Sequence, residues 1–461
     1  MGMLDGPERE RRQAAAAHSG ERLAGQDIVG VALTWVDNAG LTRVKAVPVE
    51  RLEHAAVWGV GATPAFDAFL LDDSIMSGRY SGGPSGDLRL HPDLDRLTVL
   101  AGQPGWAWAP VDRFDKEGRE HPQCARSLLR RSVDRLAEAD LTAVAAFEVE
   151  WTLGRDGAPG FTPAVTGPAY GMTRLIELSD YSRDVLNALR DEGVAVEQYH
   201  PEYGAAQFEL SVAAEDPVGA ADTSVLVRQT LRAVGQRHGL RTSFSPKVLA
   251  EGVGNGGHVH LSVHGPDGPL LSGGSGPAGL TGRGEQVVAG ILDRVPALLA
   301  LGAPSAASYL RLVASHWAGA FACWGVENRE AAIRLVPGAA GSAATSANVE
   351  VKCVDAAANP YLLLAGLITA GLAGIHTSAT LPPAVDVDPS SISQDERAAR
   401  GVRALPADLE QAAAAFEADA ELTTWFGPEL STTLVEMRRA EHALTRGMSA
   451  EEIVELTRWK H

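Results

Sequence analysis

The sequence predicts an α+β protein, and two patterns along the chain support this prediction. Segments in which apolar and polar residues alternate, such as 145–153 and 207–212, are typical of strands with one buried face. Segments rich in alanine and leucine, such as 405–426 and 431–447, are typical of helices because both residues favour the helical backbone. The chain therefore mixes strands with long helices.

Length and charge narrow the class of protein further. A chain of 461 residues is long for a single hydrophobic core and predicts two domains, or one large one. The 40 Lys+Arg against 58 Asp+Glu give a net charge of −18, which argues against a nucleic-acid-binding protein and favours cationic ligands or metals. Three widely spaced cysteines without a CxxC pair indicate a reduced, cytoplasmic compartment.

Neither the N-terminus nor the apolar runs predict a membrane segment. Residues 1–25 carry charges but no apolar stretch, so they do not form a signal peptide, and we expect a flexible lead-in there. The longest apolar run, 361–375, is shorter than the roughly 20 residues that span a bilayer. We expect a buried helix at this run and no membrane association.

After residue 25 the sequence predicts two consecutive domains. Residues 26–115 have the pattern of short strands and turns, and 28–48 predict a hairpin around the turn Asp37–Gly40. The rest of the chain, 116–461, is expected to form a second domain. It opens with a predicted helix that has Pro122 in its first turn. Apolar residues at helical spacing support this helix: Leu128, Leu129, Val133 and Leu136.

The strand predicted at 145–153 places two acidic side chains on one face. Glu148 and Glu150 lie about 6.6 Å apart at a rise of roughly 3.3 Å per residue. Like charges at that distance repel by about 2.5 kcal/mol at an effective dielectric near 20, and glutamate is a poor strand former. A solvated outer face is one explanation, and a cation bound between the carboxylates is the other.

Three further strands repeat this pattern, with apolar residues on one face and metal-ligating types on the other. Their polar faces carry Gln207 and Glu209; His258, His260 and Ser262; and Glu350 and Lys352. A solvated face would more often mix lysine, arginine, threonine and serine, whereas these types are ligands of divalent cations. The set favours a divalent-metal site. His200 lies close to it in the sequence, and whether it contacts a ligand stays open.

Three arginines lie within the short span 308–335, at Arg311, Arg329 and Arg334. Arginine binds carboxylates and phosphates as a fork, although ion pairing on the surface is an alternative explanation. Beside a metal site the arginines favour phosphate chemistry, because they neutralise charge on a transferred phosphoryl group. The glycine-rich segment 252–258 leads into a strand and is therefore not a P-loop.

Several short segments carry a family resemblance through their order and spacing. They are VDNAGLTRVKAVP, FEVEW, HPEYGAAQFEL, SFSPK, GNGGHVHLS, SYLRL, NREAAIR and EVKCVDAAANPYLLLAGLITAGL. From about Ile28 to the C-terminus the chain resembles the glutamine synthetase family. The resemblance implies a small N-terminal β-grasp domain over 26–115, and a catalytic domain over 116–461 with a curved antiparallel sheet and flanking helices. It also implies a homo-oligomer, a dodecamer of two stacked hexameric rings, with active sites between subunits.

The resemblance further implies a reaction and its metal ions. Enzymes of the family phosphorylate the γ-carboxylate of glutamate with ATP, and an amine then displaces the phosphate. Two or three Mg²⁺ or Mn²⁺ ions are expected per active site. The expected ligands are Glu150, Glu202 and Glu209 for one ion, and Glu148, His258 and Glu350 for another.

The remaining roles that the resemblance implies concern ATP, glutamate and the amine. The expected ATP and phosphate contacts are Glu197, His260, Ser262, Arg329 and Arg334. The expected glutamate contacts are Gly254, Arg311 and Lys352. The amine entrance is expected at Tyr170, Trp317 and Asp37, with Asp37 supplied by the adjacent subunit. Asp37, Arg329 and Lys352 are the expected catalytic residues.

The chain departs from the family pattern at a few positions of the expected site. Trp317 stands where glutamine synthetases carry a flap glutamate that shields the intermediate and helps to deprotonate ammonium. An indole cannot accept that proton, but it offers a cation–π wall to an alkylammonium. Asn348 and Lys352 replace two arginines, and lysine keeps the charge but loses the fork. Val253 replaces an asparagine in the loop that receives the amino acid.

These departures predict an ATP-dependent ligase that joins glutamate to an organic amine. The pattern is most similar to the γ-glutamylpolyamine synthetase branch, whose acceptors are putrescine, cadaverine, spermidine and spermine. Three alternatives stay open from the sequence: a ligase for a monoamine such as ethanolamine, an ammonia-using glutamine synthetase, and an inactive structural or sensor relative.

Overall fold

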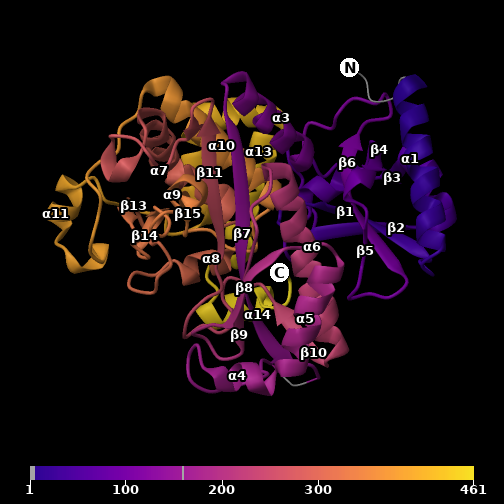
Figure 1. The fold of residues 1–461 in the computed structure, drawn as a ribbon, viewed down its shortest axis with the longest axis horizontal. Coiled ribbons are helices and arrows are strands. Elements are labelled where there is room, and N and C mark those ends of the chain that lie inside the picture. Colours follow the sequence, from indigo (N-terminus) through magenta and orange to yellow (C-terminus); the bar gives the residue numbers. More distant parts are fainter. Residues whose placement is uncertain (1–5, 158–159) are drawn as a thin grey trace.

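The structure is a computed structural model that describes residues 6–157 and 160–461. Its strands form two sheets, one within residues 30–114 and the other within residues 142–404. The first sheet lies to the right of the second in Figure 1, and helices cover both. The predicted α+β class is confirmed. The predicted boundary near residue 115 falls between the two sheets, and the exact extents of the domains stay a prediction.

The smaller sheet has the strand order β2-β1-β6-β4-β3, with β5 paired to β6. Its strands are β1 (Gly30–Val36), β2 (Thr42–Pro48), β3 (Val60–Ala62), β4 (Leu88–Pro92), β5 (Thr98–Val99) and β6 (Trp106–Phe114). β1 and β2 form the predicted hairpin, and β6 returns parallel to β1. Helix α2 (Leu52–Trp58) buries its apolar side in the same core. A hairpin, a crossing helix and a parallel return strand make up a β-grasp arrangement.

Residues 6–24 form helix α1 (Gly6–Ala24), where the sequence predicts a flexible lead-in. Glu8 forms ion pairs with Arg11 and Arg12 one turn further along, and such pairs stabilise a helix. Ala16 and Leu23 are buried in the core of the smaller sheet. The prediction for residues 1–25 is therefore wrong over this helix, because its apolar side chains pack against α2. Residues 1–5 lie outside the described residues.

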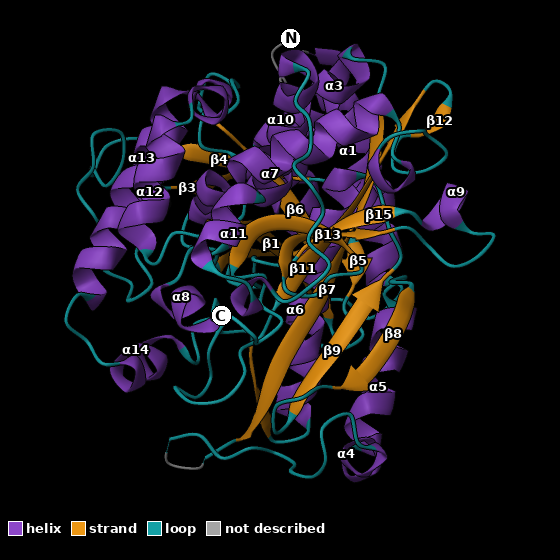
Figure 2. Ribbon diagram, turned by 90° about the vertical axis from the view of Figure 1, so that its left-hand side faces the viewer, coloured by secondary structure: helices purple, strands orange, loops and turns teal. Residues whose placement is uncertain are grey.

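The larger sheet has ten strands in the order β16-β13-β14-β15-β11-β7-β9-β8, with β10 on β7 and β12 on β11. Its strands are β7 (Thr142–Arg155), β8 (Val196–Pro201), β9 (Gln207–Val212), β10 (Leu240–Ser243), β11 (Gly257–Gly265), β12 (Gly268–Pro269), β13 (Phe321–Val326), β14 (Ala331–Val336), β15 (Asn348–Val351) and β16 (Arg403–Ala404). The predicted curved sheet is present (Figure 2). It is antiparallel except between β13 and β14, which are parallel.

Long helices cover the apolar face of the larger sheet. α10 (Pro360–Thr377) packs on α7 (Gly282–Gly302) and α3 (Ala125–Glu138), and their side chains share one core with the sheet. The other helices of the described chain are α4 (Met172–Glu177), α5 (Ser179–Asp191), α6 (Pro217–Arg237), α8 (Ala306–Arg311), α9 (Ala343–Ser346), α11 (Gln394–Ala399), α12 (Leu409–Ala418), α13 (Ala420–Thr445) and α14 (Ala450–Thr457). Within the described residues, α10 is the one helix long and apolar enough to cross a bilayer, but 83% of that stretch is buried inside the protein.

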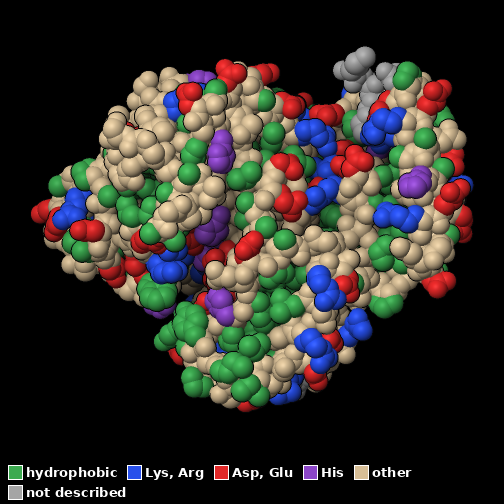
Figure 3. All heavy atoms as spheres, viewed as in Figure 1, with side chains coloured by type: hydrophobic (Ala, Val, Ile, Leu, Met, Phe, Trp, Pro, Cys, Tyr) green, Lys and Arg blue, Asp and Glu red, His purple; other side chains and the backbone are tan. Residues whose placement is uncertain are grey.

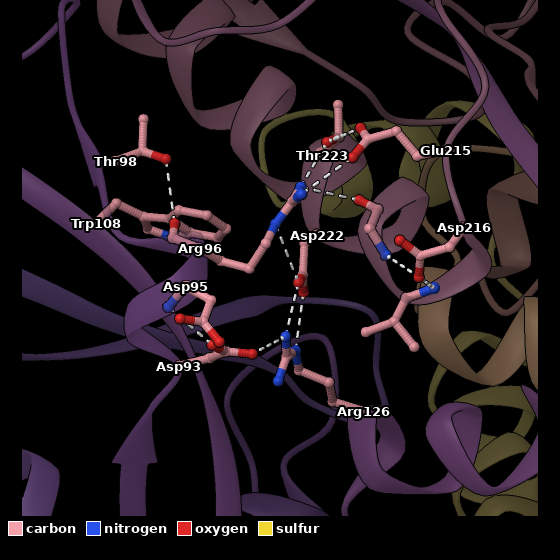
Figure 4. A network of polar contacts seen from close by, with 12 residues as sticks. Asp93, Asp95, Arg96, Thr98, Trp108, Arg126, Glu215, Asp216, Asp222 and Thr223 are labelled. Atoms are coloured by element: carbon pink, nitrogen blue, oxygen red, sulfur yellow. Dashed lines mark hydrogen bonds and ion pairs between the residues drawn. The ribbon is translucent and has the colours of Figure 1, made fainter. Parts of the chain in front are cut away.

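A buried ion network joins the two sheets and their helices (Figure 4). Arg126, in the first turn of α3, lies 2.6 Å from Asp93, 3.2 Å from Asp112 and 2.8 Å from Asp222. Asp93 and Asp112 belong to the smaller sheet and its loops, whereas Asp222 lies on α6. Tyr361 of α10 also donates a hydrogen bond to Asp222, at 2.6 Å. One guanidinium therefore holds acidic groups from both parts of the chain.

Replacing Arg126 with methionine is expected to destabilise the fold strongly. The substitution keeps an unbranched side chain but leaves buried carboxylates without their main cation, a change that typically costs about 3–5 kcal/mol. Thermal unfolding of the purified chain measures the effect. The control is Arg183→Met, because Arg183 forms its ion pairs on the exposed surface of α5, where such pairs contribute little. Equal melting temperatures for Arg126→Met and the native chain would contradict the role assigned to this network.

Candidate active site

The strand register of the larger sheet brings the predicted polar side chains into one row. Glu150 on β7 lies opposite Glu209 on β9, Glu148 lies opposite His258 on β11, and His260 lies opposite Glu350 on β15. The residues between them along each strand belong to the hydrophobic core under the helices. Because alternate residues of a strand point to opposite faces, the row lies on the face without this helix layer. Figure 3 shows histidine and acidic side chains in a depression down the middle of one face.

The first half of the row is built around Glu148. His258 Nδ1 lies 2.7 Å from Glu148 Oε1 and 3.3 Å from Glu350 Oε1, and His260 Nε2 lies 3.6 Å from Glu148 Oε2. The sequence assigned His258 to this group and His260 to ATP. In the structure, ligand atoms of Glu148, His260 and Glu350 lie within 4.8 Å of one another. Both imidazoles therefore contact the same carboxylate, and either could ligate an ion.

Glu350 differs from the other acids of the row because basic side chains of the protein already contact it. Lys352 Nζ lies 3.0 Å from Glu350 Oε1, and Arg334 Nη1 lies 2.9 Å from Oε2. Burial by itself would raise the pKa of Glu350, but Lys352 and the neighbouring histidines lower the pKa to about 2. Glu350 is therefore an anion in the folded chain at every physiological pH.

The second half of the row carries carboxylates that the protein neutralises less well. Ligand atoms of His200, Glu202 and Glu209 lie within 4.8 Å of one another, with His200 Nε2 at 3.1 Å from Glu209 Oε1. Burial raises the pKa of Glu209 to about 7, with Glu148 and Glu150 adding repulsion. Burial and Glu202 raise the pKa of Glu150 to about 7 as well. The structure thus places His200, whose role the sequence left open, inside this group.

The donor set of the row fits divalent cations. Hard cations such as Mg²⁺ and Mn²⁺ prefer carboxylate oxygens, and Mn²⁺ also accepts imidazole nitrogen. Burial, with repulsion between the acids adding to it, raises the pKa values of Glu150 and Glu209, and a bound cation would stabilise their ionised forms. The residues present therefore fit the metals that the sequence predicted, and His200 and His260 extend the predicted ligand set.

Gln207 has a positioning role that sequence reasoning missed. Its Nε2 donates to Glu150 Oε2 at 2.9 Å, to the Gly254 carbonyl oxygen at 2.9 Å and to Asn255 Oδ1 at 3.0 Å. Glu150 also accepts from the Gly256 amide at 2.9 Å. One amide side chain therefore ties the loop 252–256 to the acidic row. The signal in the sequence was the position of Gln207 on the polar face of its strand.

The predicted glutamate contacts converge beside this loop. Arg311 is buried, and its Nη2 donates to the Lys352 carbonyl oxygen at 2.8 Å. Its Nη1 is buried without a hydrogen-bond partner among the described residues, which is costly unless a ligand binds there. A Cβ atom at Gly254 would lie 2.7 Å from Arg311 Cγ, so only glycine fits this close approach. The geometry provides a buried cationic donor for a carboxylate.

The predicted ATP contacts are distributed along β8, β11 and the β14 region. His260 Nδ1 lies 2.9 Å from Asn348 Oδ1. The Ser262 hydroxyl donates to the carbonyl oxygen of Ala347 at 2.8 Å. Glu197 is exposed at a register irregularity of β8. Arg334 Nε is buried without a partner among the described residues. Arg329 faces the Trp317 ring, with Cζ 6.0 Å from the ring centroid.

The expected amine-site residues divide into two exposed aromatic residues and one buried acid. Tyr170 and Trp317 are 50% and 58% exposed, and the Tyr170 ring lies 6.3 Å from the His200 ring. Asp37, by contrast, is fully buried and accepts from Arg43 Nε at 2.6 Å and from the Ala39 and Leu41 amides. In the single chain this carboxylate is therefore enclosed in its own hairpin turn, and the contribution of Asp37 to a neighbouring subunit's site stays a prediction.

Comparisons with known proteins cover nearly the whole chain. The sequence model of a family described as glutamine synthetase, catalytic domain, matches residues 122–456. The chain is 54% identical over 452 residues to γ-glutamylpolyamine synthetase GlnA3 of Streptomyces coelicolor, covering 97% of each chain. Two solved structures are also similar to this chain. One, described as a novel glutamine synthase homolog, has a TM-score of 0.82 at 34% identity over 93% of this chain and 97% of that chain. A GmaS/ADP complex has a TM-score of 0.81 at 28% identity over 93% and 96%.

Mn²⁺ or Mg²⁺ is expected to raise the melting temperature of the chain. At 100-fold excess over its Kd, one bound ion stabilises a fold by about 2.7 kcal/mol. Glu209→Gln should reduce this shift, since it removes a ligand charge from the second half of the row. In metal-free buffer the same variant should melt no lower than the native chain, because it removes a buried charge that its neighbours repel.

Thermal unfolding with and without metal measures both effects. Glu50→Gln is the matched control, because Glu50 is exposed in the smaller domain and its replacement should leave the metal-dependent shift unchanged. Equal metal-dependent shifts for Glu209→Gln and the native chain would rule out Glu209 as a ligand.

Proposed function

The chain belongs to the glutamine synthetase family, and from that premise we propose that it joins the γ-carboxylate of glutamate to an amino group of a polyamine. The proposed acceptors are putrescine, cadaverine, spermidine and spermine, in polyamine assimilation and detoxification. The similarity to γ-glutamylpolyamine synthetase GlnA3, at 54% identity over 97% of both chains, supports this choice. The observation in the chain that carries the proposal is Trp317 in place of the flap glutamate.

The reaction that we propose has two steps. A γ-carboxylate oxygen of glutamate attacks the γ-phosphorus of ATP, the bond to ADP breaks, and γ-glutamyl phosphate forms. An amine nitrogen then attacks the acyl carbon, the bond to the phosphate oxygen breaks, and inorganic phosphate and a proton leave. Such chemistry depends mainly on positioning and on neutralising charge, and the residues of the row suit both tasks.

The two halves of the row are the proposed metal sites, with two or three Mg²⁺ or Mn²⁺ ions per active site. The first half offers Glu148, His258, Glu350 and His260, and the second offers Glu150, Glu202, Glu209 and His200. Bound there, the ions would neutralise phosphate oxygens and orient the transferred group. The side chains of the row supply the ligand atoms. The strands that carry them are held in place because their opposite, apolar face packs in the hydrophobic core.

Buried cationic groups beside the row are the proposed binding groups for the two anionic substrates. The free Nη1 of Arg311 would bind the α-carboxylate of glutamate in a fork, with Gly254 leaving room beside it. Lys352, already close to Glu350, would face the reacting carboxylate. Arg329 and Arg334 would stabilise charge on the transferred phosphoryl group. Glu197, His260 and Ser262 are the proposed contacts to the nucleotide.

Aromatic and acidic groups are the proposed binding groups for the amine. Trp317 and Tyr170 are exposed aromatic residues, and an aromatic face attracts an alkylammonium through its quadrupole. Tyr170 also stands beside His200, next to the acids of the second half of the row. An apolar wall and nearby carboxylates suit a cation with a methylene chain better than they suit ammonium.

We also propose a cytoplasmic homo-oligomer, a dodecamer of two stacked hexameric rings. The support in the structure is a set of large apolar side chains that a single chain leaves exposed around α4. They are Tyr170, Met172, Ile176 and Tyr203, each at least 50% exposed. Apolar side chains gather at the lower end of the molecule in Figure 3. Contiguous apolar patches of this kind are typical of surfaces that another chain covers.

An acceptor panel tests the proposed function. The full chain is incubated with ATP, glutamate, Mg²⁺ and one of ammonium, ethanolamine, putrescine or spermidine, and phosphate release and product mass are measured. We expect γ-glutamylpolyamines with little turnover of ammonium. Efficient glutamine formation from ammonium would contradict the proposal, as would exclusive use of ethanolamine. No phosphate release with any amine would support an inactive relative.

Replacing Trp317 with glutamate is expected to lower kcat/KM for polyamines by about 3- to 30-fold, because a cation–π contact of about 0.5–2 kcal/mol is lost. Trp317→Phe is the matched control, since it keeps an aromatic face at the same place and should lose less. Steady-state kinetics with putrescine and spermidine measure the change. If Trp317→Glu leaves polyamine kinetics unchanged, Trp317 does not select the amine.

A further inference from the structure

The segment 312–320, which links α8 to β13, has an unusual backbone conformation. Ser315 and Trp317 have φ values of 61° and 55°, and Gly319 has a φ of 69°. Residues other than glycine rarely adopt this left-handed region, and they stay there only when surrounding contacts hold them. Trp317 is the residue of this segment that is proposed to meet the amine, and its side chain is 58% exposed. Whatever holds the segment therefore also places the Trp317 indole.

One buried carboxylate holds both strained residues. Glu330 Oε1 accepts from the Trp317 amide at 2.7 Å, and Glu330 Oε2 accepts from the Ser315 amide at 3.2 Å. Glu330 is only 6% exposed. Backbone amides that converge in such a segment form a concave anion-binding nest, and here the anion is a side chain of the protein. Sequence reasoning assigned no role to Glu330.

The turn that carries Glu330 is itself anchored. Asn328 Oδ1 accepts from the Glu330 amide at 3.0 Å, and Asn328 Nδ2 donates to the Val385 and Val387 carbonyl oxygens at 2.8 Å and 3.1 Å. The Ser315 hydroxyl donates to Asp388 in the same region, at 2.7 Å. The segment 312–320 and the turn around Glu330 are thus fixed to one stretch of chain, 385–388.

Arg329, the neighbour of Glu330 in the chain, lies near the side chain of the same tryptophan. Arg329 Cζ lies 6.0 Å from the centroid of the Trp317 ring, while Glu330 binds the Trp317 backbone. Arg329 is also the proposed contact to the transferred phosphoryl group. Adjacent residues therefore link the phosphate side of the site to the residue that would meet the amine.

We propose that Glu330 is a positioning residue for the amine step, which holds the segment 312–320 closed so that the Trp317 indole meets the amine and water stays away from the acyl phosphate. This inference rests on the proposed function and deepens it. Loss of the Glu330 contacts should free the segment. Water would then compete with the amine for γ-glutamyl phosphate, and the amine would bind more weakly.

Glu330→Gln tests this inference, because glutamine has the same shape but only one acceptor oxygen for the two amides. The assay measures phosphate released and γ-glutamylamine formed, with whichever amine the native chain accepts. For Glu330→Gln we expect more phosphate than product, and a rise of about tenfold in the KM for the amine. The KM values for ATP and glutamate should stay as in the native chain. A merely structural defect would lower all activity without changing the ratio of phosphate to product.

Two further variants make the result decisive. Glu330→Asp keeps the charge and both acceptor oxygens on a shorter side chain, so it should couple phosphate release to product better than Glu330→Gln. Glu396→Gln is the control, since Glu396 forms an exposed ion pair on α11 and should behave as the native chain does. A one-to-one ratio and a native KM in Glu330→Gln, or better coupling in Glu330→Gln than in Glu330→Asp, would overturn the proposal. Failure of the native chain with every polyamine would instead overturn the proposed acceptor and leave the ratio measurable with another amine.

Discussion

The repulsion between carboxylates that the sheet register holds side by side is the constraint on which the rest of this structure depends. Glu148 and Glu150 project from β7, Glu209 lies on the neighbouring strand β9, and Glu350 lies beyond β11 on β15. These groups cannot move apart along their strands, because a shift of one residue would turn the apolar face outward. The helices packed on that face therefore stabilise an arrangement that the acidic row by itself would oppose.

The two halves of the row meet this repulsion in different ways. Around Glu350, the protein supplies its own cations, Lys352 and Arg334, and the acid stays ionised. In the second half, burial and mutual repulsion raise the pKa values of Glu150 and Glu209 to about 7, although His200 contacts Glu209. An external cation would gain most in the second half, because there the side chains of the protein relieve the repulsion between the acids less completely than Lys352 and Arg334 do around Glu350.

The stretch from Glu330 to Arg334 connects the acidic row to the segment that carries Trp317. Arg334 contacts Glu350 in the row, and only a few residues earlier Glu330 binds the backbone of the segment that carries Trp317. A strand and its preceding turn can transmit position well because β14 is hydrogen-bonded on both sides. Arg334, which is proposed to contact the phosphoryl group, and Glu330, which binds the backbone of the proposed amine residue Trp317, therefore belong to one strand and its preceding turn. The network around Arg126 joins the smaller sheet to the larger one.

The sequence by itself determined the polar faces of β7, β9, β11 and β15, the buried helix α10 and the family resemblance. These features follow from alternation, apolar length and motif spacing, which are local properties of the chain. Only the tertiary structure decided that His200 joins the second half of the row, that Asp37 is buried and that α1 packs as a helix. It also decided the parallel pairing of β13 with β14 and the roles of Gln207 and Glu330. Each of these depends on which distant segments lie together, and register and packing between distant segments leave no periodic signal in the sequence.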